Sequence, residues 1–119
     1  MNWYELDDGK TIGQTGSESG IIIADEEYES MTKITIEKDG TIVPFSITCG
    51  IYGWMMHTRF FGSEEEARIQ MKLMKSKLAS IVDMIPLKDK ATEDSFKNFF
   101  IFFLRYFKMI KQFLFISFP

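Results

Sequence analysis

Residues 63–86 read SEEEARIQMKLMKSKLASIVDMIP and carry the strongest structural signal in the chain. Ser63 and Glu66 form an S-x-x-E capping box, in which the serine hydroxyl accepts a hydrogen bond from the Glu66 amide. Apolar residues recur at helical spacing on one side of this segment, namely Ala67, Met71, Met74, Leu78, Ile81, Val82 and Ile85. Pro86 cannot continue a helix. We therefore predict one amphipathic helix over about 63–85.

The chain before this helix has the pattern of antiparallel strands. Residues 31–37 alternate, with Thr32, Ile34 and Ile36 on one face and Lys33, Thr35 and Glu37 on the other. Shorter strand-like runs lie at 3–6, with Thr11-Ile12 as a candidate return arm, and at 21–23, where the acidic run 25–29 closes the strand. Four or five such strands under one covering helix predict an α+β domain.

The segment Gly50–Gly53, GIYG, interrupts a long apolar run between residues 45 and 61. We favour a tight turn here, which divides the run into two strands at about 45–49 and 54–61. A bulge within one long strand is the alternative.

Three regions follow from this pattern. Residues 1–86 form the α+β domain, residues 87–94 a polar linker, and residues 95–119 a tail that holds nine of the twelve phenylalanines and no carboxylate. On a helical wheel the tail divides into a basic stripe and a broad apolar face. Its candidate membrane-contacting residues are Phe99, Phe103, Phe107, Phe113, Lys97, Arg105, Lys108 and Lys111.

The tail has several interpretations. A membrane-spanning helix is disfavoured, because Arg105, Lys108 and Lys111 would each cost roughly 2.5–3.5 kcal/mol at the centre of a bilayer. An interfacial helix with phenylalanines on one side and cations on the other fits better. Self-association or binding of a partner, packing against the domain, and translation of A/T-rich DNA after a frameshift or read-through remain open.

Composition limits the function classes. A chain of 119 residues suits one core. Residues 1–62 hold ten acidic and four basic side chains, a net charge of −6. This charge disfavours nucleic acid as a partner and favours a basic protein surface.

Cys49 is the single cysteine, which excludes an intrachain disulfide and a multi-thiolate zinc site. We expect no cofactor and no metal. The first residues do not resemble a secretory signal, so we expect a cytoplasmic protein, with the inner face of the membrane as the alternative.

The candidate partner-binding residues belong mainly to the acidic run, with an aromatic side chain as the apolar anchor; they are Asp25, Glu26, Glu27, Tyr28, Glu29 and Trp54. A nucleophile–base pair of Cys49 and His57 is disfavoured, because a turn at 50–53 would place them on different rungs of the hairpin. The loop Gly13–Gly20 matches no phosphate-binding motif, and we interpret it as a flexible connector.

The segments GQTGSESGIII (13–23) and TCGIYGWMMHTRFFGSEEEA (48–67) resemble those of small bacterial proteins of unassigned function, some of them similar to immunity proteins. The resemblance extends over about Trp3–Pro86 and implies a small, acidic α+β protein that binds and blocks a toxin. It assigns no catalytic residue. The expected function is therefore a non-enzymatic protein-binding module, with a tail-anchored peripheral membrane protein as the alternative and an enzyme as the third possibility.

The membrane interpretation predicts that the full chain co-sediments with liposomes and that a chain ending at Lys90 does not, because the truncated chain lacks the Phe-rich, cationic segment. Sedimentation with anionic vesicles measures this. Equal partitioning of the two chains would exclude a membrane anchor in residues 95–119.

Overall fold

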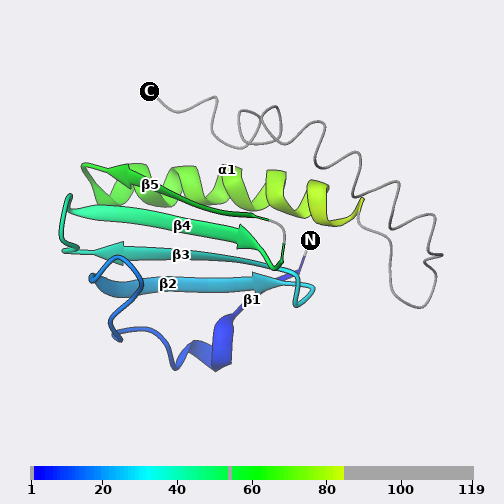
Figure 1. Cartoon of the computed structure of the whole chain (residues 1–119), viewed down its shortest axis with the longest axis horizontal. Coiled ribbons are helices and arrows are strands. Elements are labelled where there is room, and N and C mark those ends of the chain that lie inside the picture. The colour runs from blue at the N-terminus through cyan, green and yellow to red at the C-terminus, as the bar shows by residue number, and fades with distance from the viewer. Residues whose placement is uncertain (1, 54, 85–119) are drawn as a thin grey trace.

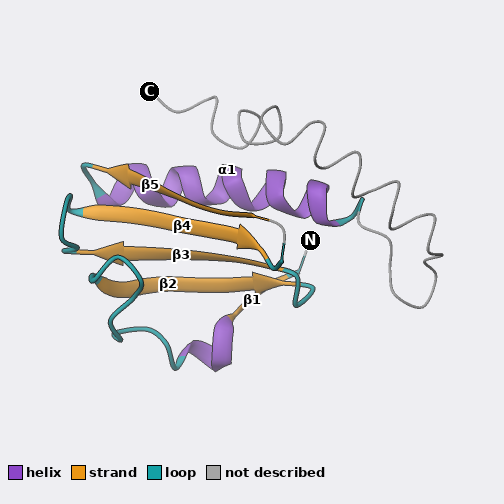
Figure 2. Ribbon diagram, in the orientation of Figure 1, coloured by secondary structure: helices purple, strands orange, loops and turns teal. Residues whose placement is uncertain are grey.

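A computed structural model of the protein describes residues 2–53 and 55–84. The elements are β1 Trp3–Glu5, the 3-10 helix η1 Leu6–Gly9, β2 Ile21–Tyr28, β3 Thr32–Lys38, β4 Phe45–Ile51, β5 Met55–Phe61 and α1 Glu64–Val82. The strands form one antiparallel sheet in the order β1-β2-β3-β4-β5 (Figure 1). Figure 2 shows α1 along one face of this sheet. The predicted α+β architecture is confirmed.

Helix α1 begins as the capping box predicts. Ser63 has an extended backbone, and its hydroxyl accepts a 3.2 Å hydrogen bond from the Glu66 amide. The helix ends at Val82, and the Asp83 amide donates to the Ala79 carbonyl. The buried residues of the helix are Ala67, Met71, Met74, Leu78, Ala79, Ile81 and Val82. The predicted apolar stripe is confirmed over the described part of the helix.

The core lies between α1 and one face of the sheet. Neighbouring strands place their partner residues on the same face, so Ile36 of β3 stands beside Ile47 of β4, and both are fully buried. Ile34 is equally buried beside Cys49. Each large apolar side chain removed from water in this way contributes about 1.5–3 kcal/mol. This layer explains why the alternation in β3 is so regular.

A second group of contacts joins the edge of the sheet to the C-terminal half of α1. The Lys75 ammonium lies 2.7 Å from a Glu26 carboxylate oxygen and 5.7 Å from the centre of the Trp3 ring. Trp3 packs at 5.5 Å from the Tyr28 ring, and the Tyr28 hydroxyl donates to Asp83. These contacts fix β1 and β2 against the helix.

The structure corrects two sequence-based boundaries. Strand β2 does not close at the acidic run but continues through it to Tyr28, because pairing with both β1 and β3 orders the backbone of Glu26 and Glu27. Thr11-Ile12 is no return arm for β1, since β1 pairs with the end of β2.

The hairpin at 50–53 is a turn, as we favoured, but it is shorter than predicted. Gly50 and Ile51 belong to β4, and only Tyr52 and Gly53 are described in the turn before β5. The resulting register places Cys49 directly opposite His57, whereas we expected different rungs. Trp54, Ile85, Pro86, the linker 87–94 and the tail 95–119 lie outside the described residues.

Truncation of Leu78 tests the core. Leu78 is fully buried between α1 and the sheet, so Leu78→Ala should lower the free energy of unfolding by about 2–5 kcal/mol through lost burial and the cavity it leaves. Leu73→Ala is the matched control, because Leu73 lies on the same helix with 44% of its surface exposed. Urea denaturation compares the two, and similar losses would contradict this packing.

Candidate functional site

The face of the sheet away from α1, here called the open face, carries a row of polar side chains across four strands. The register places Asp25, Thr35, Thr48 and Thr58 side by side. The Thr35 hydroxyl donates a 2.8 Å hydrogen bond to Asp25 Oδ1, and the hydroxyls of Thr48 and Thr58 lie 3.1 Å apart. An apolar sheet face would need a second covering layer, whereas this face presents hydrogen-bonding groups.

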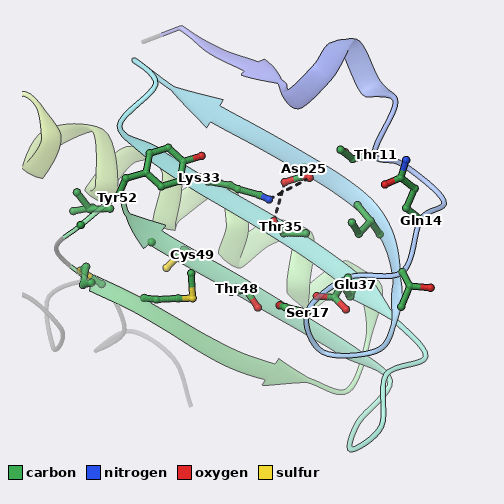
Figure 3. A pocket seen from close by; sticks show the side chains of 18 residues that line it. Thr11, Gln14, Ser17, Asp25, Lys33, Thr35, Glu37, Thr48, Cys49 and Tyr52 are labelled. Atoms are coloured by element: carbon green, nitrogen blue, oxygen red, sulfur yellow. Dashed lines mark hydrogen bonds and ion pairs between the residues drawn. The ribbon is translucent and has the colours of Figure 1, made fainter.

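A pocket of about 680 Å³ lies over Asp25, Thr35 and Thr48 of this row. Figure 3 shows Lys33 and Tyr52 at one end of the pocket and Gln14 and Ser17, from the loop after η1, at the other. Gly50 stands opposite Lys33 in the register and adds no side chain to the floor. The volume falls in the range of pockets that bind small molecules.

Asp25 is the most unusual group in the pocket. Its side chain has no exposed surface, and its Oδ2 accepts no hydrogen bond within the described part of the chain. The Lys33 ammonium lies 3.7 Å from this oxygen. The hydroxyl oxygen of Thr11, another residue of the pocket wall, is also buried without a hydrogen-bond partner among the described residues. Buried polar atoms of this kind are costly, so they indicate a site for a ligand or water.

Glu37 holds the loop that forms one wall. The residue is 1% exposed, and its carboxylate accepts hydrogen bonds from the Glu18 amide, at 3.1 Å, and from the Gly20 amide, at 3.0 Å. A Cβ atom at Gly16 would clash with the carboxyl carbon of Glu37, so a side chain there would displace this carboxylate from the amides that it binds. We expected a flexible connector at Gly13–Gly20, but the structure shows a loop anchored to the sheet.

A third carboxylate, Glu27, lies on the open face beside the pocket. It accepts hydrogen bonds from the Tyr52 hydroxyl at 2.6 Å and from the Tyr4 hydroxyl at 2.7 Å. These two bonds, the one from Tyr52 first, lower the pKa of Glu27. Burial and the same bond raise the pKa of Tyr52. Glu27 therefore stays ionised, and both rings are held at the pocket rim.

The structure divides the predicted partner-binding residues between different surfaces. Asp25 and Glu27 face the open side, whereas Glu26 and Tyr28 face α1 and bond to Lys75 and Asp83, because successive side chains of a strand alternate. Glu29 lies in the turn between β2 and β3, where it and Ser30 both have positive φ. Trp54 lies outside the described residues, and the binding role of the group stays a prediction.

Cys49 and His57 lie directly opposite each other, yet the arrangement does not favour nucleophilic catalysis. Cys49 is 1% exposed, and burial raises the pKa of its thiol to about 12. A thiol with this pKa is protonated at neutral pH, and the thiolate is the nucleophilic form.

Residues 2–53 and 55–84 contain no cluster of three or more His, Cys, Asp or Glu side chains that could hold a metal ion. None of their helices combines the length and apolar character that crossing a bilayer requires.

Comparisons with protein-family models, with curated proteins and with solved structures find no match to the chain. The interpretation of the site therefore depends on its own geometry.

The sequence indicated a binding role for Asp25 and Glu27, which stays a prediction, but it indicated none for the residues around them, which are Thr11, Lys33, Thr35, Glu37, Thr48, Gly50 and Tyr52. One signal could have found part of this set. The alternation of 31–37 already placed Lys33, Thr35 and Glu37 on one face, and continuing β2 through the acidic run would have placed Asp25 beside Thr35.

The Glu27 pKa offers a test of the rim. Tyr52→Phe removes the stronger of two hydrogen bonds, so the Glu27 pKa should rise toward its ordinary value of 4.5, and Tyr4→Phe should raise it less. Because the folded-state pKa is lowered, these bonds stabilise the fold above about pH 4.5 and lose their effect as the pH falls through the folded-state pKa. Carbon-13 NMR titration of the Glu27 carboxyl measures the shift; an unchanged value in Tyr52→Phe would contradict the geometry.

Proposed function

We propose that the protein is a non-enzymatic protein-binding module that receives a basic segment of a partner protein on the open face of its sheet. The observation that carries this proposal is Asp25, a fully buried carboxylate with one oxygen that accepts no hydrogen bond from the described residues, at a pocket of about 680 Å³. A cationic donor from a partner would satisfy this oxygen.

The residues around the pocket support binding of a protein surface. Exposed large side chains of the open face and its rim are Tyr4, Tyr52, Met56 and Phe60, with exposures from 43% to 77%. Aromatic residues and methionine are enriched in protein interfaces, where they supply apolar contact around a smaller number of polar groups. A polar centre with an apolar rim suits a partner that presents a cation among apolar side chains.

Charge favours a basic partner. The net charge of −6 over residues 1–62, which include the whole sheet, attracts cationic surfaces and accelerates their association. Segments 13–23 and 48–67 resemble those of small bacterial proteins of unassigned function, and some of those proteins are similar to immunity proteins, which bind and block a toxin. An inhibitor of that type, acting in the cytoplasm, is the form of binding module that we propose.

The test compares matched charge changes on the full chain. Asp25→Asn and Glu27→Gln remove a negative charge from the open face, whereas Glu65→Gln removes one from the exposed first turn of α1. After affinity capture of a partner from the source cells, biosensor kinetics at two salt concentrations measure its binding to each variant. We expect Asp25→Asn to weaken binding at least about tenfold, which corresponds to 1.4 kcal/mol.

Glu27→Gln should mainly slow association and reduce its dependence on salt, because this carboxylate lies at the rim. Glu65→Gln should leave both nearly unchanged. A captured partner that binds all three variants as tightly as the unchanged protein would place its binding surface elsewhere and end this proposal.

A further inference from the structure

We propose that the pocket binds the guanidinium group of an arginine from the partner, and that Lys33 occupies the place of this group in the free protein. This inference rests on the proposed function, because it names the chemistry of the partner at the same site.

The ion pair between Asp25 and Lys33 is longer than a hydrogen bond. Their charged atoms lie 3.7 Å apart, whereas Lys75 and Glu26 approach to 2.7 Å in the same molecule. Charge-assisted hydrogen bonds have lengths of about 2.7–2.9 Å. Lys33 therefore neutralises Asp25 at a distance without hydrogen bonding to Oδ2, and a better-placed donor would gain the bond that Lys33 does not make.

The position of the Lys33 side chain controls whether a ligand can reach Asp25 Oδ2. The Asp25 side chain is fully buried, but that of Lys33 is 37% exposed and extends into the pocket (Figure 3). Lys33 also stands directly opposite Glu27 in the register, so its ammonium can leave Asp25 and remain beside a carboxylate. Movement of one lysine side chain would expose Oδ2 to the pocket without a change in the sheet.

The groups around Asp25 favour a guanidinium over an ammonium. Asp25 and Glu27 are two residues apart on one strand, so their backbones lie about 7 Å apart on the same face. Thr35 already donates to Asp25 Oδ1, which leaves Oδ2 as the oxygen to be satisfied. A guanidinium carries five N–H donors in a planar fork and can also stack on an aromatic ring such as Tyr52, whereas an ammonium is a point charge.

Competition by Lys33 follows from this arrangement. If an arginine must displace Lys33, removing the lysine should strengthen arginine binding rather than weaken it. Lys38→Gln is the matched control, because Lys38 lies on the same strand but pairs with Phe45, which packs against the core on the α1 side of the sheet. Both substitutions remove one positive charge, so a difference between them reports the position of the charge and not its sum.

The experiment is a nitrogen-15 NMR titration of the full-length protein with N-acetyl-arginine amide, N-acetyl-lysine amide and N-acetyl-citrulline amide. Citrulline has the shape of arginine without its charge. We expect the arginine probe to shift the amide signals of Thr35, Gly50 and Tyr52, the lysine probe to bind at least several-fold more weakly, and the citrulline probe to cause no shift. Lys33→Gln should tighten arginine binding about tenfold relative to Lys38→Gln, and Asp25→Asn should abolish it.

The possible results separate the two proposals. Equal affinity of Lys33→Gln and Lys38→Gln for the arginine probe would overturn the displacement of Lys33, and this comparison does not require the Asp25 variant to fold. Absence of pocket shifts with any probe would overturn the arginine site. If a captured protein partner is then still sensitive to Asp25→Asn and Glu27→Gln, the proposed function stands without this inference; if it is insensitive, both fall.

Discussion

Strand β3 has buried side chains on both of its faces, with Lys33 and Lys38 as its partly exposed residues, and the rest of the molecule is arranged around this constraint. Ile34 and Ile36 are covered by α1, while Glu37 on the other face lies under the loop after η1. The apolar side needs only burial, which a helix of suitable length supplies. The polar side needs hydrogen bonds, and the amides of Glu18 and Gly20 supply them. The loop is thus a structural layer of the domain, and it also gives the pocket its wall.

The open face contains two buried carboxylates in different circumstances. Glu37 accepts backbone hydrogen bonds at both of its oxygens and holds the loop. Asp25 accepts one from Thr35 and has a second oxygen with only a distant ammonium. The cost of burying a carboxylate is met within the fold for Glu37 but only in part for Asp25. This difference is why we assign Glu37 a structural role and Asp25 a binding role.

The sequence predicted what depends on local pattern. The capping box at Ser63, the apolar stripe of α1 and the alternation of β3 are local signals, and each is present in the structure. The length of β2 was wrong because Glu26 and Glu27 are poor strand formers that are held in place by β1 and β3 on either side. The anchored loop depends on a contact between residues seventeen to nineteen positions apart, which no periodicity reveals. The pocket could not be predicted for the same reason.

The sheet is a meander in which every strand pairs with its neighbour in the chain, and this connectivity bears on how the protein reaches its native state. The connections from β2 to β3, from β3 to β4 and from β4 to β5 are short, so the entropy lost in closing these three hairpins is small, and topologies of low contact order fold quickly. The turn at Glu29 and Ser30 works against this, because both residues adopt positive φ without glycine. Closing the β2–β3 hairpin therefore requires Glu29 and Ser30 to adopt a backbone conformation that most side chains disfavour. Asn-Gly at these two positions would lower this conformational cost. The same hairpin brings Asp25 beside Thr35, so formation of the pocket floor depends on this turn.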